Sequence, residues 1–307
     1  MVDVGTPVAP ARVAAELTDR TVIARFKDLE VHLVCAHEAR ATMDEIGRIR
    51  EIEFRAAGAG RNVARDIDSF DTDFPWYVQL VSWDPAERQI VALYRAIRCS
   101  WALRHAGLQA LRTSGLFQFS DEFIRDYLSR SVELGRSVVN RTARRALQGL
   151  FSIWTGLGAM TREWPDVDYF FGNVSLYRSL PQHAVAAIVD YLRRYHSANP
   201  GLVTARYPAL PATAELPKEG LSQAAALERL LATAGREGWS FPPILLSYLK
   251  AHSGLMWFDA AMDRDFGGAI EVAIAVPTRG VSPRTVKRFV DPYTSMNPRR
   301  FILPERP

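Results

Sequence analysis

The stretch Val132-Glu133-Leu134-Gly135-Arg136-Ser137-Val138-Val139 has the composition of a buried strand, yet it carries two charged residues in its middle. A charge inside an apolar strand is unfavourable unless it is paired or put to use. On a regular strand, Glu133 and Arg136 point to opposite faces because they are three residues apart. A bulge at Gly135 adds a residue and brings both side chains to one side. The stretch therefore predicts either a bulged strand that holds a polar substrate or a structural ion pair at a sheet edge.

Strand-like and helix-like segments alternate on either side of this stretch. Alternation of apolar residues over 31–35 predicts a strand, and apolar residues at helical spacing over 41–57 predict a helix. Two apolar segments joined by a polar turn at 84–87 predict a hairpin. This order favours an α/β (α+β) fold with a mixed central sheet and helices on both faces. Downstream we expect a helix over 142–162, a strand over 168–175, a helix from 181, and two last strands near 256 and over 270–276.

The length of 307 residues suits one large domain or two ordinary ones. A composition of 48% hydrophobic and 23% charged residues is typical of a soluble protein with a sizeable core. We expect a single domain over 26–280, with a proline-rich connecting insertion over 199–240. Residues 1–25 are predicted to be a weakly ordered lead-in, and residues 281–307 a C-terminal tail.

Several functional classes find no support in the sequence. Cys35, Cys99 and the six histidines form no pair at metal-ligand spacing, so we expect reduced thiols and no metal site. No apolar run is long enough to span a bilayer, and residues 1–17 lack the pattern of a secretory signal, which predicts a cytoplasmic protein. The formal charge of +4 is spread along the chain, without a basic tail or a nucleic-acid-binding motif.

The densest basic cluster, Arg141, Arg144 and Arg145, follows the bulged strand. Such a cluster is usually solvated surface. The alternatives are docking of an acidic protein, of a phosphate-bearing ligand or of an anionic membrane face, which would make the chain a peripheral membrane protein. The predicted helix that begins here also presents its first amides beside the bulge, as a ready anion site.

Further charged residues stand out upstream. Arg50 and Phe54 lie four apart and so share one side of a predicted helix. Asp68 and Asp71 belong to a group of four carboxylates that repel one another unless cations lie near, and the alternative is a solvated acidic loop. Arg95 stands in the middle of a predicted strand, where the alternative is an edge strand with its arginine in water.

Taken in order, these residues form the pattern Arg-x-x-x-Phe, Asp-x-x-Asp, an arginine after a tyrosine in a strand, and Glu-x-x-Arg. This pattern resembles that of the acyl-homoserine lactone synthases and their relatives, which are GNAT-like acyltransferases. Later segments resemble the bacterial ornithine–acyl carrier protein N-acyltransferases, once described as haemolysin-like. An acid is expected shortly after the last of these segments, and Glu271 meets that expectation loosely. The segments are Phe171-Gly172-Asn173-Val174-Ser175-Leu176, Pro242-Pro243-Ile244-Leu245-Leu246-Ser247-Tyr248-Leu249-Lys250 and Asp263-Arg264-Asp265-Phe266-Gly267.

The resemblance implies transfer of a fatty acyl group, such as a 3-hydroxyacyl group, from acyl carrier protein to the amine of an amino acid. Ornithine is the expected acceptor, which makes the reaction the first step of ornithine-lipid synthesis. No cofactor is implied beyond the acyl-acyl carrier protein co-substrate. Residue chemistry agrees, since Glu133 can draw a proton from the amine through water and amides at the bulge can stabilise an oxyanion. A bulge also splays its neighbouring strands and leaves room for a pantetheine arm.

We therefore predict Glu133 and Arg136 as catalytic residues. Two other functions stay open: a synthase of N-acyl amino acid or acyl-homoserine lactone signals, and a non-catalytic protein that binds acyl chains or acyl carrier protein. Because no glycine-rich turn of the coenzyme A-binding type follows Asn140, the basic cluster is predicted to dock acyl carrier protein. The predicted substrate-binding residues are Arg50, Phe54, Asp68, Asp71, Arg95, Asp263 and Asp265, and the predicted docking residues are Arg141, Arg144 and Arg145.

Overall fold

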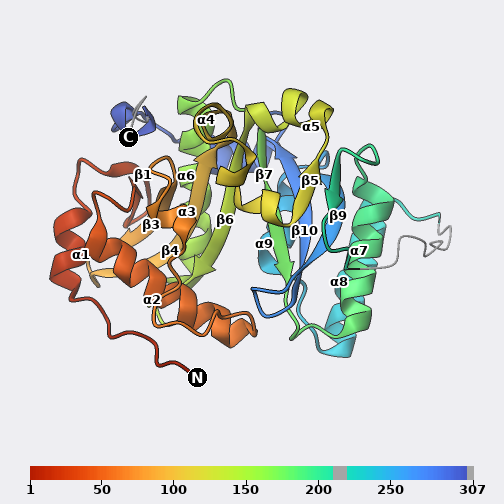
Figure 1. Ribbon diagram of the computed structural model, residues 1–307, viewed down its shortest axis with the longest axis horizontal. Coiled ribbons are helices and arrows are strands. Elements are labelled where there is room, and N and C mark those ends of the chain that lie inside the picture. The colour runs from red at the N-terminus through yellow and green to blue at the C-terminus, as the bar shows by residue number, and fades with distance from the viewer. Residues whose placement is uncertain (210–219, 303–307) are drawn as a thin grey trace.

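The computed structural model describes residues 1–209 and 220–302 and is built around an eight-stranded sheet in the order β1-β2-β3-β4-β6-β7-β10-β9 (Figure 1). Neighbouring strands of this sheet are antiparallel except β6 and β7, which are parallel. The mixed sheet predicted from the sequence is therefore confirmed. The strands are β1 Val22–Phe26, β2 Leu29–Val34, β3 Val78–Asp84, β4 Gln89–Arg98, β6 Ser131–Val139, β7 Tyr169–Leu176, β9 Met256–Asp263 and β10 Ala269–Pro277, with a separate pair formed by β5 Phe117–Phe119 and β8 Val203–Ala205.

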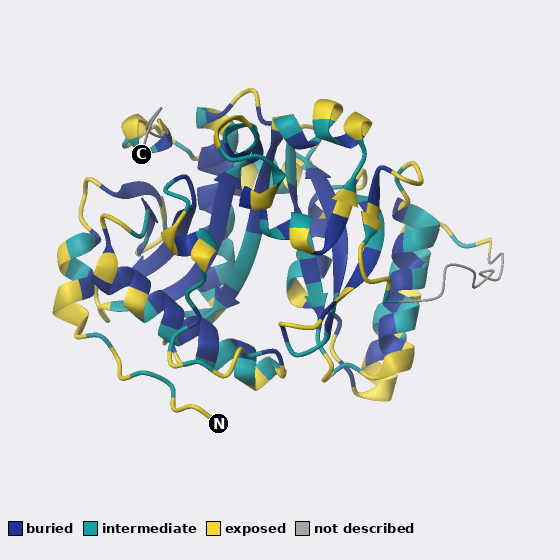
Figure 2. Ribbon diagram, viewed as in Figure 1, coloured by how far each residue is buried: buried dark blue, intermediate teal, exposed yellow. Residues whose placement is uncertain are grey.

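Helices cover both faces of the sheet, as predicted. Leu80 and Val81 are adjacent on β3 and so point to opposite faces. Val81 belongs to an apolar cluster with Ile46 of α2, whereas Leu80 would lie 2.9 Å from a Cβ added at Gly156 of α6. The strands are buried between these layers (Figure 2). The helices are α1 Pro10–Glu16, α2 Arg40–Ala57, α3 Ser69–Thr72, α4 Cys99–His105, α5 Asp121–Asp126, α6 Ala146–Glu163, α7 Gln182–His196, α8 Gln223–Glu237, α9 Pro243–Ala251 and α10 Pro283–Thr285.

The predicted bulge lies on β6. Leu93 of β4 pairs with Val138, and Arg95 pairs with Gly135, so Tyr94 alone faces two residues of β6, Arg136 and Ser137. Arg136 takes up the extra length with a positive φ of 55°, a conformation that L-residues other than glycine adopt uncommonly. The bulge thus lies immediately after Gly135 rather than on it.

The parallel strands β6 and β7 separate at the bulge. Their pairing runs from Ser131 and Tyr169 to Leu134 and Gly172 and ends there, although both strands continue. The two strands diverge from this point, which divides the sheet into two halves (Figure 1). At the last pair the backbones approach so closely that a Cβ on Gly172 would lie 2.4 Å from the carbonyl oxygen of Leu134. The splayed pair predicted from the sequence is therefore confirmed.

The two ends of the chain differ from the prediction. Residues 1–25 contain helix α1 and most of the edge strand β1. Val13 of α1 and Val22 of β1 are apolar and buried, which holds this segment against the rest of the protein. Residues 281–302 are not a loose tail, since they form helical turns whose Phe289 and Phe301 are buried. The end of the predicted tail, 303–307, lies outside the described residues.

The predicted insertion over 199–240 holds regular structure at both ends. It contains β8, which pairs with β5, and α8, which follows after residues 210–219, a segment outside the described residues. Among the described residues we find no helix whose length and apolar character would suffice to cross a bilayer.

Candidate active site

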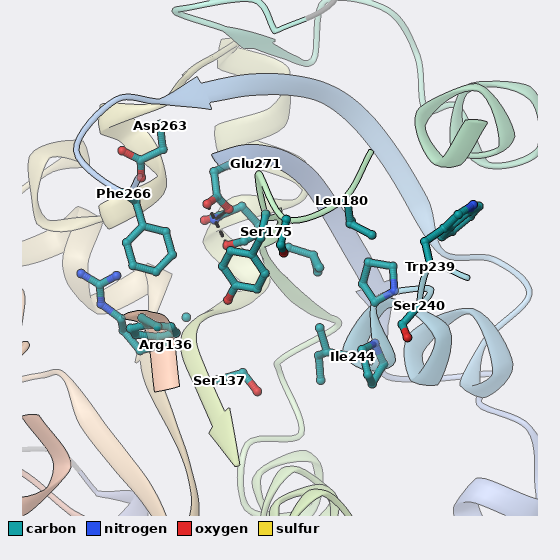
Figure 3. Close-up of a pocket in the computed structure, with 18 of the residues that line it drawn as sticks. Arg136, Ser137, Ser175, Leu180, Trp239, Ser240, Ile244, Asp263, Phe266 and Glu271 are labelled. Atoms are coloured by element: carbon teal, nitrogen blue, oxygen red, sulfur yellow. Dashed lines mark hydrogen bonds between the residues drawn. The ribbon is translucent and has the colours of Figure 1, made fainter. Parts of the chain in front are cut away.

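A cavity of about 470 Å³ occupies the place where β6 and β7 part (Figure 3). One wall is the bulge, from Gly135 to Ser137, and the facing wall is Asn173 to Ser175 of β7. The cavity exists because pairing stops at Gly172, so that no ladder fills the space between the strands. A gap at this place was predicted from the sequence, and its use by a pantetheine arm stays a prediction.

The two ends of the cavity differ in chemistry. Arg136 and Asp263 lie at one end with the ring of Phe266, as Figure 3 shows. The other end is mostly apolar, with Leu180 and Trp239 among its side chains, and the carboxylate there, Glu237, is exposed and paired with His183. A molecule with a charged head and an apolar tail matches this gradient.

Two of the predicted substrate-binding residues, Arg50 and Asp71, lie inside the core. Arg50 Nη1 donates to Asp71 Oδ2 at 2.9 Å, and its Nη2 donates to Gln79 Oε1 at 2.7 Å. Burial acts to raise the pKa of Asp71, but the charges of Arg50 and Arg95 outweigh it and hold that pKa well below its usual range. Because this pair is buried and hydrogen-bonded, it joins α2, α3 and β3 rather than facing the cavity.

Arg95 and Arg136 link this buried network to the cavity. Arg95 Nη1 donates to Asp68 Oδ1 at 2.6 Å and also lies 3.2 Å from Asp71. Arg136 Nη2 donates to the other oxygen of Asp68 at 3.2 Å, and its guanidinium stands over the rings of Phe54 and Phe266. Burial lowers the pKa of Arg136. The predicted residues Phe54, Asp68, Arg95 and Arg136 are thus brought together.

The predicted base, Glu133, is occupied by four donors from its own chain. Its Oε1 accepts from Tyr77 Oη at 2.9 Å and from the Arg112 amide at 3.0 Å. Its Oε2 accepts from the amide of Thr113, at 3.1 Å, and from the Thr113 hydroxyl. Glu133 is not among the residues that line the cavity. In this arrangement it fixes the backbone of the helical turn Arg112–Gly115, and its predicted role as the base stays untested.

Arg112 is a residue that the sequence reasoning missed. Its side chain lines the cavity, is about a quarter exposed, and donates to Asp263 Oδ2 at 2.5 Å. The sequence signal for it is weak, because Arg112 lies in an irregular segment far along the chain from Asp263. Asp265, the neighbour of Asp263 in the same predicted motif, lines a different cavity.

This second cavity, also of about 470 Å³, shares a wall with the first. The shared residues are Arg112, Arg136 and Phe266. Asp68 and Asp265 line the second cavity alone. The side chains of Arg112, Arg136 and Phe266 therefore separate the two cavities.

Glu271 is the second residue that sequence reasoning underrated. It lies on β10, opposite Ser175 of β7, and lines the cavity between its polar and apolar ends (Figure 3). Ser175 Oγ donates to Glu271 Oε1 at 2.7 Å, and the Asn173 side-chain amide donates to Oε2. Burial raises the pKa of Glu271, which the two hydrogen bonds oppose without cancelling.

The basic cluster predicted to dock acyl carrier protein carries intramolecular ion pairs. Exposed Arg141 bonds Glu53 through Nε at 2.5 Å, and exposed Arg144 bonds Glu87 at 2.5 Å. Arg145 lies 3.3 Å from Asp28 and 3.4 Å from Asp84. The docking role stays a prediction, since these surface pairs can exchange partners at small cost.

Among the described residues, no group of three or more histidine, cysteine, aspartate or glutamate side chains is arranged to hold a metal ion. The cavity offers arginines, which can bind a carboxylate, the backbone of a bulge, which can stabilise an oxyanion, and a buried carboxylate, which can accept a proton.

These features define an acyltransferase of the GNAT type, and residues 49–154 match the model of the acetyltransferase (GNAT) domain. The chain is 31% identical to a glycine N(alpha)-acyltransferase of Bacteroides thetaiotaomicron, over 99% of this chain and 94% of that protein. It is 30% identical to a glycine N(alpha)-acyltransferase of Phocaeicola vulgatus, over 97% and 95% of the two chains. The chain therefore belongs to this family of N-acyltransferases.

Similar solved structures include two synthases. The acyl-homoserine lactone synthase LasI is 11% identical, with a TM-score of 0.39 over 85% of this chain and 94% of the other. FeeM, an N-acyl amino acid synthase from uncultured soil microbes, is 11% identical, with a TM-score of 0.37 over 85% and 95%.

Proposed function

We propose that the protein transfers a fatty acyl group from a pantetheine thioester to the α-amine of a small, neutral amino acid, with glycine as the leading acceptor. The observation that carries the proposal is the cavity between β6 and β7, with arginine and carboxylate at one end and apolar side chains at the other. The product, an N-acyl amino acid, is a lipid, so we also expect a cytoplasmic enzyme with peripheral contact to a membrane.

The bulge supports the thioester half of the proposal. A bulged residue is left out of the strand ladder, so its amide is free for another acceptor. Such an amide at Arg136 or Ser137 would face the carbonyl oxygen of a thioester in the cavity and stabilise the charge that develops on it.

The ion pairs at the polar end of the cavity favour a neutral amino acid as the acceptor. Asp263 bonds Arg112, and Asp68 is shared by Arg95 and Arg136. Ornithine, the acceptor expected from the resemblance, carries a second ammonium, and the two carboxylates Asp263 and Asp68 are already paired with arginines. Glycine needs one cation for its carboxylate, and Arg112 is the most exposed arginine of the polar end. The curated relatives at 31% and 30% identity are glycine N(alpha)-acyltransferases, which agrees with this acceptor.

The donor is expected to be acyl carrier protein rather than coenzyme A. The turn after β6 is closed by Asn140, whose Oδ1 accepts from the amide of Thr142 at 3.2 Å and from its hydroxyl at 2.8 Å. These bonds use groups that would otherwise be free to receive a pyrophosphate. Exposed Arg141 and Arg144 lie beside this turn, on the surface where an acidic protein would dock.

Competition between acceptors tests the proposal. The purified protein is given one acyl-acyl carrier protein and equal concentrations of glycine, ornithine and lysine, and the products are separated by mass spectrometry. We expect glycine to win by about tenfold in kcat/KM, since an unpaired second ammonium costs roughly 1–3 kcal/mol in a partly buried site. Preference for ornithine would overturn the neutral acceptor and restore the ornithine-lipid assignment, while acyl transfer would stand.

Two controls address the remaining alternatives. The same acyl group on coenzyme A, at the same concentration, tests the donor, and we expect lower kcat/KM with it. Release of free thiol that depends on an amino acid excludes a non-catalytic binder. A lactone product from S-adenosylmethionine would instead indicate a synthase of acyl-homoserine lactone signals.

A further inference from the structure

We infer that Glu271, rather than Glu133, is the catalytic residue that takes the proton from the amine of the acceptor. The inference rests on the proposed function and names the base of that reaction. The sequence pointed to Glu133 because an acid inside the bulged strand is conspicuous. The structure places that acid outside the cavity and places Glu271 inside it.

The position of Glu271 suits a base. It projects from β10 between Phe266 at the polar end and Leu180 at the apolar end (Figure 3). The Asn173 and Ser175 side chains that hold it come from β7, immediately past the point where β7 leaves β6. The carboxylate is therefore fixed at the β7 wall of the cavity, across from the bulge where the thioester is proposed to bind.

The surroundings of Glu271 tune it for proton transfer. Burial raises its pKa, the hydrogen bonds from Ser175 and Asn173 lower it, Asp263 raises it and Arg112 lowers it. The net effect is a raised pKa, which makes the carboxylate a stronger base than an exposed glutamate. Burial, followed by the charge of Glu271, raises the pKa of Tyr177 to about 12, so this phenol stays neutral.

Glu133 has the opposite character. Both of its oxygens accept hydrogen bonds from the chain itself, and two of the four donors are backbone amides of the Arg112–Gly115 turn. A carboxylate held in this way anchors the turn and does not line the cavity. We therefore treat Glu133 as a positioning residue that acts through Arg112.

The reaction releases one proton overall. The amino acid arrives as an ammonium ion, and the carboxylate of Glu271 takes one proton to become a neutral acid. The free amine attacks the thioester carbonyl, a C–N bond forms and the carbonyl electrons move onto the oxygen. The C–S bond then breaks, and the thiolate takes the second proton from nitrogen to leave as a thiol. Glu271 returns its proton to water, so the products are an amide, a thiol and one proton.

The test compares Glu271→Gln with Glu133→Gln, using glycine and aminooxyacetate as acceptors. Aminooxyacetate is a glycine analogue whose amine is already unprotonated at neutral pH, so it needs no base to remove the first proton. We expect Glu271→Gln to lose about 100-fold or more in kcat with glycine. With aminooxyacetate its kcat should lie within about tenfold of wild type. The acidic limb of its pH profile with glycine should move to higher pH, because turnover then depends on the fraction of glycine that is already a free amine.

Glu133→Gln should respond differently. It should raise KM for glycine and for aminooxyacetate alike, because a loosened Arg112 serves the carboxylate of both, and it should keep the acidic limb. If thermal denaturation shows that Glu271→Gln folds poorly, Glu271→Asp is tested in its place. Its carboxylate is one methylene farther from the substrate, so we expect a kcat between those of wild type and Glu271→Gln. Because a base is still present, the acidic limb of the pH profile should stay near its wild-type position.

Two results would overturn the inference. One is near-normal turnover of glycine by Glu271→Gln, and the other is an equal loss with both acceptors, which would indicate a structural role. Failure of the proposed function is seen separately, as failure of the wild type to acylate any amino acid. In that case the same variants are compared on whichever amine the wild type does acylate.

Discussion

Charged residues of this chain either form buried ion pairs or line the cavity, and their spacing in the sequence does not tell these two roles apart. Arg50 and Asp71 were expected to bind substrate, yet they are fully buried and bond each other. Breaking such a pair leaves a buried charge without compensation, at a cost of about 3–5 kcal/mol. Arg112 and Glu271, in contrast, face the cavity. A loss of activity in a variant must therefore be compared with its stability, because variants of Arg50 or Asp71 would lose activity by unfolding.

A change at Ser175 should move the pH dependence without removing the base. Its hydroxyl donates to Glu271 and so lowers the pKa of that carboxyl, against the larger effect of burial. In Ser175→Ala the pKa should rise, so that the carboxylate is protonated at a higher pH than before. We expect the acidic limb of kcat/KM against pH to move to higher pH, with the plateau within about threefold of wild type.

The measurement is a pH profile of glycine acylation at constant ionic strength. Ser247→Ala is the matched control, because its hydroxyl donates to the Pro243 carbonyl on α9, away from the base. A limb that stays in place, or moves to lower pH, would contradict the role given to Ser175.

At the scale of single elements, β6 and β7 were both predicted as strands, but their close contact at Gly172 was not. Glu133 and Arg136 on either side of Gly135 predicted a bulge, because a regular strand would place them on opposite faces and bury one of the two charges without a partner. The close approach at Gly172 has no such signal. It depends on the carbonyl of Leu134 in another strand, and a single sequence does not show which strands become neighbours.

The two glycines beside the parting should respond oppositely to a methyl group. A Cβ on Gly172 would lie 2.4 Å from the Leu134 carbonyl oxygen, whereas one on Gly135 would meet no heavy atom within 4 Å. We expect Gly172→Ala to lower the free energy of unfolding by about 1–3 kcal/mol, since the strands must move apart. Gly135→Ala should keep its stability, or gain slightly, because alanine restricts the unfolded chain more than glycine.

Activity should follow the reverse order among folded protein. Gly135 lines the cavity, so a methyl there occupies space that the thioester needs. Urea unfolding and acyl transfer, measured on the same preparations, check both statements. Equal stabilities for the two variants would refute the close contact, and full activity of Gly135→Ala would move the thioester away from the bulge.

For the whole molecule, the sheet with its bulged and splayed strands followed from local patterns. The contact of Arg112 with Asp263 at the polar end of the cavity did not, because these two residues lie 151 positions apart along the chain. Their meeting depends on β10 pairing with both β7 and β9 and on Glu133 holding the Arg112 turn. Such long-range placements carry no periodicity that a single sequence could show.

The last prediction concerns the C-terminal segment 281–307, which the sequence analysis described as a tail. Phe289 packs against Phe151 and Trp154 of α6, with ring centroids 6.1 and 5.8 Å apart. Its backbone comes so near α6 that a Cβ on Gly158 would lie 2.0 Å from the Phe289 carbonyl oxygen. Phe301 also accepts a hydrogen bond, at 2.9 Å, from Trp164 Nε1 through its carbonyl. The segment is thus part of the layer that covers α6.

Removing residues 281–307 should therefore destabilise the protein rather than leave it unchanged. Each buried phenylalanine contributes about 1.5–3 kcal/mol, so the truncated chain should melt well below the full chain or aggregate. Phe289→Ala should lower the free energy of unfolding by about 3–5 kcal/mol. Met296→Ala is the matched control in the same segment, since that side chain is 37% exposed and should tolerate the change. Because none of these residues lines the cavity, folded Phe289→Ala protein should keep its kcat, and a truncated chain with an unchanged melting temperature would show that the segment is a tail after all.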